Sequence, residues 1–273
     1  RRPPRSTQGV SSAASDVYKR QAGVAPGDLM PAGGVGEVIE SRSEVINVGD
    51  IVQSMNFGWQ EYSVLGIDGV NKVDPDLAPI QSSLSYLGMP GLTAYFGLFE
   101  VGAARPGDTV VISAASGAVG QVAGQLAKAH GCRTIAVASN NTKLDWCREI
   151  VYDAGINYKE VKDLQKALRT NCPNGVDVYF DNTAGPIHDA VMQNLNLNAR
   201  VAVCGVVSLA DKIGKPDIGQ RYLRQILVNR ARIQGFLVFD FAERYNEAQD
   251  YIGGLLRDGT VSYTHLRAHE TRH

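Results

Sequence analysis

The chain has 273 residues, enough to bury a large core in one or two domains. Hydrophobic residues make up 44% and charged residues 20% of it, an ordinary globular composition. Because 27 Lys and Arg stand against 28 Asp and Glu, the net charge is -1, which argues against nucleic acid or an anionic membrane as the main partner. No apolar run reaches the roughly 20 residues that cross a bilayer.

The four cysteines are dispersed and form no CxxC pair. This spacing predicts free thiols in a cytoplasmic protein rather than a disulfide framework or a structural zinc site. We therefore expect no metal site in the body of the chain.

The two ends differ in character from the rest. Residues 1–21 are rich in Arg, Ser and Pro, and residues 262–273 read SYTHLRAHETRH. Both resemble translated sequencing adaptors, so we interpret them as non-native segments that flank a chain lacking its native start and finish. A metal site at His265, His269 and His273 is the alternative for the tail, although nothing around these residues would fix their geometry.

Residues 22–83 predict part of a β-rich domain. GGVGEVIES, GDIVQSM and QEYSVLG are short β-type runs with Gly and Asp turns between them. The next stretch, SSLSYLGMPGLTAYFGLFEVG, predicts two helical segments broken at Met89-Pro90-Gly91.

Residues 84–261 predict a second, α/β domain in which apolar strand-like runs alternate with helical segments. Strands apolar on both faces and joined by helices imply a doubly wound parallel sheet. The predicted strands are 109–115, 133–139, 156–160, 176–185, 200–207 and 232–239. The predicted helices are 119–131, 142–155, 161–171, 187–198, 219–230 and 243–259.

The first predicted strand of this domain runs into the turn SGAVG. Gly117 and Gly120 let the backbone turn tightly and approach a pyrophosphate, and the helix that begins there points free N–H groups at the phosphates. The small residues Ala123, Gly124 and Ala127 allow this helix to lie close to the sheet. The turn therefore predicts a dinucleotide site, whereas a P-loop is unsupported because GxxxxGK[ST] is absent.

The end of the second strand favours a particular dinucleotide. NAD-specific sites place an acid there to bind the ribose 2′-hydroxyl, but this chain reads Ser139-Asn140-Asn141-Thr142-Lys143. Neutral polar groups and a lysine suit a 2′-phosphate. A solvated lysine at a helix start is the alternative for Lys143.

The strings GMPGLTAYFGL, AASGAVGQVAGQLAK, INYK, FDNTAG and CGVVS resemble the zinc-independent medium-chain reductases of the leukotriene/prostaglandin reductase and curcumin reductase group. The resemblance covers about residues 33–259. It implies a Rossmann domain beside a GroES-like β-rich domain, here partial, with NADP(H) as cofactor, reduction of activated C=C bonds without zinc, and a homodimer formed along the strand near RIQGFLVF.

The resemblance also implies roles for individual residues. It assigns the pyrophosphate turn to Gly117, Ala118, Val119 and Gly120, the 2′-phosphate lysine to Lys143, and a tyrosine beside that phosphate to Tyr158. It assigns a nicotinamide-side asparagine to Asn182, a loop lining the cofactor to Cys204 and Gly205, and a backbone stretch at the nicotinamide amide to Phe236, Leu237 and Val238. Packing or turn roles are the alternatives for Tyr158 and Asn182, and Cys204 is interpreted as cofactor-adjacent packing.

The catalytic residues stay unknown at this level. The group commonly has a tyrosine in the loop after CGxxS, where this chain has Ala210. Tyr62, in the run QEYSV, is a candidate proton donor, with a strand aromatic as its alternative. His188 is interpreted as a surface or capping residue at a helix start.

Three other functions stay open beside enone or enal reduction. A quinone reductase would use the same cofactor, and a non-catalytic NADPH-binding protein would have a structural or sensing role. Zinc alcohol dehydrogenase chemistry is disfavoured because Met89 stands where related zinc enzymes place a cysteine ligand and because their cysteine cluster is missing.

Overall fold

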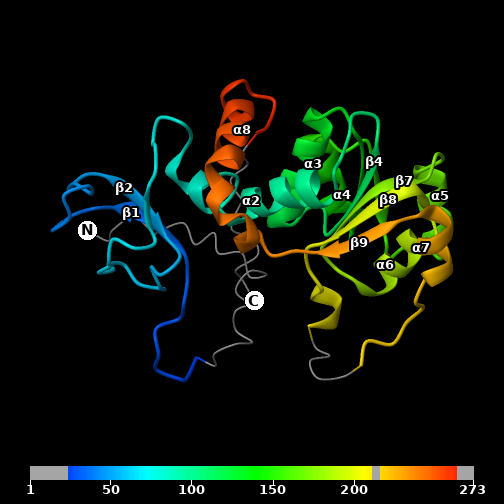
Figure 1. Cartoon of the computed structure of the whole chain (residues 1–273), viewed down its shortest axis with the longest axis horizontal. Helices are drawn as coiled ribbons and strands as arrows, with labels where there is room; N and C mark the ends of the chain where they lie inside the picture. Colours follow the sequence, from blue (N-terminus) through cyan, green and yellow to red (C-terminus); the bar gives the residue numbers. More distant parts are fainter. Residues whose placement is uncertain (1–23, 211–215, 263–273) are drawn as a thin grey trace. The chain divides into compact units, whose positions relative to one another are not determined.

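The computed structural model describes residues 24–210 and 216–262 (Figure 1). These fall into two compact units, one formed by the chain up to Pro90 together with residues from Gly253 on, the other by Gly91–Ile252. The sequence predicts a boundary at 83/84 instead, and the domain limits stay a prediction. The two segments interpreted as non-native lie outside the described residues except for Ser262.

The first unit contains a three-stranded antiparallel sheet in the order β1-β2-β3. Its strands are β1 (Gly34–Glu37), β2 (Ile51–Ser54) and β3 (Val70–Lys72), and a 3-10 helix, η1, follows at Ile80–Leu84. The first two strands agree with the predicted β-type runs. The third run, QEYSVLG, was wrongly predicted as a strand: it is irregular, and its Tyr62 and Val64 are exposed because no strand of the described chain pairs with it.

The second unit is built on a six-stranded parallel sheet in the order β6-β5-β4-β7-β8-β9. The strands are β4 (Thr109–Ser113), β5 (Arg133–Ala138), β6 (Ala154–Asn157), β7 (Val176–Asp181), β8 (Leu195–Val203) and β9 (Arg232–Gly235). From β4 the chain first adds strands on one side, β5 and β6, and then on the other side, β7, β8 and β9. This is the order of a doubly wound dinucleotide-binding sheet, so the predicted fold class is confirmed.

Helices join these strands and cover both faces of the sheet (Figure 1). The helical elements are α2 (Met89–Phe96), the π-helix η2 (Gly97–Val101), α3 (Ala118–Ala129), α4 (Asn141–Ile150), α5 (Leu164–Asn171), α6 (Gly185–Met192), η3 (Val207–Leu209), α7 (Leu223–Asn229), η4 (Val238–Arg244) and α8 (Tyr245–Arg257). Pro90 lies in the first turn of α2, where a missing N–H costs nothing, so the helix begins at the predicted break.

The core follows the two-residue period of the strands. Val111, Tyr179 and Val201 pack with side chains of α5, α6 and α7 on one face. Their strand neighbours Ile112 and Phe180 are equally buried on the opposite face, because successive side chains of a strand alternate. The helix predicted at 187–198 ends at Met192 instead, because residues 195–198 alternate apolar and polar side chains and extend β8.

Candidate cofactor and active site

The turn between β4 and α3 leaves a row of amides without partners. Its backbone reverses at Ala114, which has a positive φ of 48°, and the amide of Gly117 donates to the Ala114 carbonyl at 2.9 Å. Within the described chain, the amides of Ala118, Val119 and Gly120 have no hydrogen-bond acceptor. The first turn of α3 carries no acidic side chain. These features together suit a negatively charged group.

Helix α3 is held against its neighbours by a tyrosine that sequence reasoning missed. The hydroxyl of Tyr152 donates to the carbonyl of Gly120 at 2.7 Å, and its ring occupies the space that a Cβ on Gly124 would need. A Cβ on Gly120 would overlap the carbonyl oxygen of Ala114. Both glycines are therefore required by packing, in addition to any role toward a ligand.

The next helix, α4, carries Lys143 in its first turn. Asn140 caps this helix by accepting from the Lys143 amide at 2.9 Å, so the backbone at Lys143 is fixed while its ammonium group has no ion-pair partner among the described residues. Tyr158 follows β6; its amide donates to the Ala138 carbonyl at 3.2 Å, and its side chain is 37% exposed. Both side chains are available to a ligand at the carboxyl ends of β5 and β6.

Asn182 is fixed to the neighbouring strand rather than free. Its backbone amide donates to the Ser113 hydroxyl at 2.9 Å, and its side-chain amide donates to the Ser113 carbonyl at 2.8 Å. The predicted nicotinamide-side residue therefore lies at the carboxyl ends of β4 and β7, where ligands bind in sheets of this type.

Asp181, the preceding residue, organises this end of the sheet and was not singled out from the sequence. Its carboxylate is fully buried. One oxygen accepts from the amides of Thr183 and Ala184 at 2.9 and 2.8 Å and from the Tyr179 hydroxyl at 2.9 Å. The other oxygen lies 2.8 Å from Nδ1 of His188.

This environment sets the ionisation of Asp181. Burial by itself would raise its pKa, but the hydrogen bonds from His188 and from the amides of Ala184 and Thr183 outweigh burial and lower the pKa below its ordinary value of 3.8. His188, interpreted from the sequence as a surface or capping residue, is partly buried, with 22% of its side chain exposed, and contacts Asp181; α6 has no side-chain cap.

The loop after β8 is attached to the same aspartate. The amides of Cys204 and Gly205 both donate to the Asp181 carbonyl, at 2.8 and 3.0 Å. A Cβ on Gly205 would lie 2.9 Å from the Asn182 carbonyl oxygen, so these loops touch. Burial raises the pKa of the Cys204 thiol to about 12, which keeps it protonated at neutral pH and agrees with a packing role.

The last predicted stretch follows β9. The ring of Phe236 packs edge-on against Phe180 at 6.5 Å and fills the space beside Gly97. Leu237 is 57% exposed, whereas Val238 is buried at the start of η4. The structure thus places Phe236 next to β7 and η2, beside the strand that ends in Asp181.

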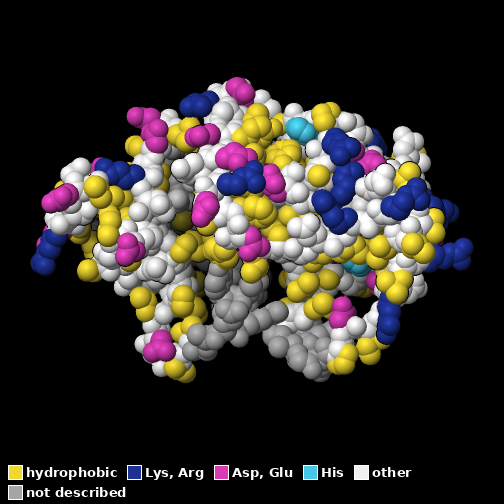
Figure 2. Space-filling model, viewed as in Figure 1, with side chains coloured by type: hydrophobic (Ala, Val, Ile, Leu, Met, Phe, Trp, Pro, Cys, Tyr) yellow, Lys and Arg dark blue, Asp and Glu magenta, His cyan; other side chains and the backbone are white. Residues whose placement is uncertain are grey.

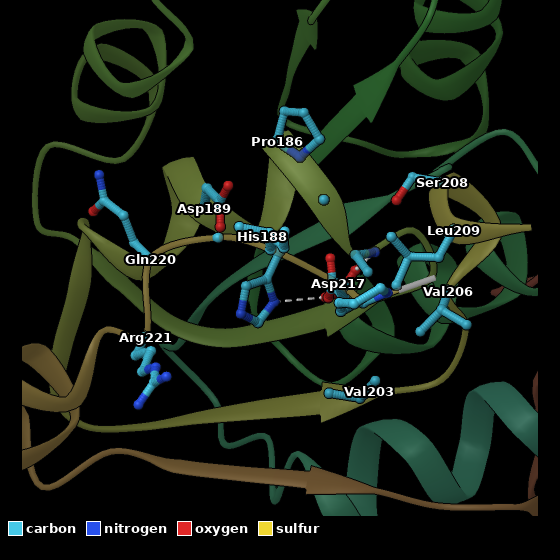
Figure 3. Close-up of a pocket in the computed structure, with 16 residues that line it drawn as sticks. Pro186, His188, Asp189, Val203, Val206, Ser208, Leu209, Asp217, Gln220 and Arg221 are labelled. Carbon is cyan, nitrogen blue, oxygen red and sulfur yellow. Dashed lines mark hydrogen bonds and ion pairs between the residues drawn. The ribbon is translucent and has the colours of Figure 1, made fainter. Parts of the chain in front are cut away.

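A cavity of about 730 Å³ lies where the loops after β7 and β8 meet (Figure 3). Its wall includes Asp181, His188 and Val206. Figure 3 labels His188, and the dashed line that leaves its imidazole marks the contact with Asp181 given above. None of the predicted cofactor residues lines it. The cavity therefore adjoins the residues around Asn182 and does not contain the predicted cofactor surface.

Residues that would hold a metal are not gathered in the described part of the chain, where no group of three His, Cys, Asp or Glu is placed around one point. The three histidines of the tail lie outside the described residues. No helix of the described chain is long and apolar enough to cross a membrane.

Comparison with known proteins gives the family. Residues 118–252 match the family model described as zinc-binding dehydrogenase, and residues 10–73 match the model described as N-terminal domain of oxidoreductase. The second match begins inside the segment interpreted as non-native, and it supports the oxidoreductase assignment for the first unit.

Two curated relatives and one solved structure are similar over most of the chain. The 2-alkenal reductase (NADP(+)-dependent) of Nicotiana tabacum is 38% identical over 247 residues, which are 90% of this chain and 71% of that protein. Prostaglandin reductase 1 of Mus musculus is 37% identical over 228 residues, 82% and 69% of the two chains. The structure of CurA in complex with NADPH from Vibrio vulnificus has a TM-score of 0.82 at 31% identity and covers 93% of this chain and 78% of that one.

The doubly wound sheet and these relatives together define a dinucleotide-dependent oxidoreductase. The chain belongs to the medium-chain dehydrogenase/reductase family, in the group of NADP-dependent reductases that includes these relatives. The resemblance stated from the sequence is confirmed.

Proposed function

We propose that the protein binds NADPH and reduces the activated C=C bond of α,β-unsaturated carbonyl compounds, without zinc. Two neighbouring features carry this proposal. Among the described residues, three amides at the start of α3 have no acceptor, and Lys143 in the first turn of α4 has no ion-pair partner. The end of β5, which precedes α4, carries no acidic residue. The 2-alkenal reductase and prostaglandin reductase relatives support the substrate class.

The residues present fit the cofactor. Amides at a helix N-terminus bind phosphate oxygens well, and the dipole of α3 adds to their attraction. Lys143 and Tyr158 would hold the 2′-phosphate, and Asn182 would lie on the nicotinamide side. The loop at Cys204 and Gly205 and the stretch Phe236–Val238 would complete the site.

Bound NADPH supplies the hydride. The residues of the chain must hold the substrate and stabilise the charge that develops on its carbonyl oxygen. In the loop of residues 204–210, Ala210 cannot donate a proton, and the hydroxyl of Ser208 donates to the Thr183 carbonyl at 2.6 Å. We infer that this loop provides no proton donor. A ribose hydroxyl of the bound cofactor together with an ordered water would take that role, with Tyr62 as the weaker side-chain candidate.

The cofactor assignment is tested with Lys143→Ala. A lysine–phosphate contact contributes about 1.5–3 kcal/mol, so NADPH binding, followed by fluorescence titration, should weaken by roughly 10–100-fold while NADH binding stays unchanged. Lys166→Ala is a matched control, because Lys166 occupies the same position after the cap Asp163 of α5. An equal loss for NADPH and NADH would show that Lys143 supports the fold instead.

The activity is tested by NADPH consumption with a panel of enones, enals and quinones. Turnover of enones above quinones is expected. Faster turnover of quinones than of enones would identify the protein as a quinone reductase. Binding of NADPH without turnover of any substrate in the panel would favour a non-catalytic protein.

We further propose a homodimer formed along β9. This strand ends the described sheet and pairs only with β8, and all four of its residues are exposed. The adjoining helix α7 exposes Leu223, Leu227 and Val228, and Figure 2 shows hydrophobic side chains at the surface along this part of the molecule. Light scattering after size exclusion should give twice the mass of one chain, and Leu227→Asp should return it to one.

A cytoplasmic location is proposed on the grounds of the cysteines. Cys132, Cys147, Cys172 and Cys204 are all free, as expected in a reducing compartment. Fractionation of cells that express the native gene would test this, and recovery outside the cytoplasm would contradict it.

A further inference from the structure

The two halves of the proposed 2′-phosphate site are joined by a chain of side-chain hydrogen bonds. Asn157, the last residue of β6, donates from its side-chain amide to the side-chain oxygen of Asn141 at 3.1 Å. Asn141, the first residue of α4, donates in turn to both carboxylate oxygens of Glu160 at 3.2 and 3.0 Å. These hydrogen bonds thus connect the helix that carries Lys143 to the segment that carries Tyr158.

The residues that make these hydrogen bonds are held by further contacts. Asn157 is 6% exposed, and its side-chain oxygen accepts from the amide of Lys159 at 3.2 Å, so its orientation is determined by the turn after β6. Its carbonyl accepts from the amide of Glu160 at 3.2 Å, which fixes the backbone that carries the carboxylate. The rigid side of the contact is therefore β6 and its turn.

Asn141 uses both ends of its carboxamide, which accepts from Asn157 and donates to Glu160. An aspartate in its place would present two acceptors and would face the Glu160 carboxylate with a like charge. An alanine would remove both contacts. The chemistry of this position thus requires an amide.

We propose that Asn141, Asn157 and Glu160 form a clamp that sets the distance between Lys143 and Tyr158 and thereby selects a dinucleotide with a 2′-phosphate. The clamp rests on the proposed NADPH site. It has a second effect on Glu160. Hydrogen bonds from Asn141 hold the Glu160 carboxylate in one position, whereas a carboxylate free to move toward the 2′-phosphate would repel it. The three residues are positioning residues, acting through Lys143 and Tyr158.

The test compares NADPH and NADH in the purified protein. Asn141→Ala should raise the dissociation constant for NADPH by roughly 5–20-fold and leave that for NADH unchanged, because NADH lacks the group that the clamp serves. Asn141→Asp should weaken NADPH further. Asn171→Ala at the end of α5 is the control, since Asn171 also makes a side-chain hydrogen bond, to the Ala167 carbonyl, and should affect neither.

Circular dichroism and thermal unfolding separate this effect from a folding defect, and Glu160→Gln provides a second arm. That variant keeps an oxygen for Asn141 and removes the charge, so NADPH should bind as tightly as before or more tightly. Equal changes for NADPH and NADH, or no change for Asn141→Ala while Lys143→Ala weakens NADPH, would overturn the clamp alone. If Lys143→Ala is also without effect, the cofactor site itself is wrong.

Discussion

Nδ1 of His188 on α6 lies 2.8 Å from Oδ2 of Asp181 at the end of β7. A buried carboxylate is thereby joined to an imidazole at the wall of the cavity (Figure 3). Because the other carboxylate oxygen accepts from two amides and a hydroxyl, Asp181 holds the turn at Thr183–Ala184 in place. Its carbonyl also anchors the loop at Cys204, so several proposed cofactor residues depend on this aspartate.

Asp181→Asn should lower the free energy of unfolding by about 3–5 kcal/mol, since an amide supplies one acceptor oxygen where the buried carboxylate supplies two, and the charge beside His188 is lost. Urea denaturation measures this. Asp145→Asn on α4 is the control: Asp145 pairs with Arg148 at the surface, and its loss should cost less than about 1 kcal/mol. Similar losses for both variants would contradict the central place of Asp181.

The lowered pKa of Asp181 also predicts a pH dependence. Its folded-state pKa lies below the unfolded value, so its stabilisation is present above about pH 4 and is lost as the pH falls through the folded-state pKa. The free energy of unfolding of the parent protein should therefore drop more steeply below about pH 4 than that of Asp181→Asn. Parallel curves for the two proteins would show that Asp181 titrates normally.

Ala184→Gly should stabilise the protein. Ala184 has a φ of 57° and a ψ of -159°, a conformation that glycine adopts far more easily, and such strain costs about 1–3 kcal/mol. The midpoint of urea unfolding should rise. Ala190→Gly in the interior of α6, where φ is helical, should lower the midpoint instead, and a lower midpoint for Ala184→Gly would mean that its methyl group contributes more than its strain costs.

The two glycines of the turn between β4 and α3, the proposed pyrophosphate site, should respond differently to alanine. A Cβ on Gly120 would overlap the Ala114 carbonyl and lie 2.8 Å from the Cα of Ala115, whereas one on Gly117 would meet only the Ala114 oxygen at 3.1 Å. Gly120→Ala should shift α3 and lose both NADPH affinity and stability. Gly117→Ala should lower thermal stability less, as scanning fluorimetry can measure; equal losses would contradict this.

Tyr62→Phe tests the proton source. Tyr62 is 72% exposed in an irregular segment, and we expect its removal to change kcat on an enone only slightly. Ala210→Tyr should preserve or raise kcat and leave NADPH affinity alone. A fall in kcat of roughly 100-fold for Tyr62→Phe, with the fold intact, would identify its hydroxyl as the general acid.

The sequence by itself was sufficient for the fold class, the family and the position of the first strand–helix turn of the sheet. Alternating apolar strands and helices determine a doubly wound sheet, and Gly117 and Gly120 mark its first turn, because these signals are local and repeat at fixed periods. The absence of an acidic residue between the end of β5 and Lys143, which favours NADP(H), could also be read from the sequence. Where a period was ambiguous, as in QEYSVLG and at residues 195–198, the prediction was wrong, because strand pairing depends on neighbours distant in the chain.

Only the tertiary structure decided which side chains hold the site together. Asp181 meets Ser113 across 68 residues, Tyr152 meets Gly120 across 32, and Asn157 meets Asn141 across 16, and no sequence pattern marks these pairs. A buried carboxylate or amide is stable only when its hydrogen bonds are satisfied, and its partners come from whichever strands and loops the fold brings to the same point.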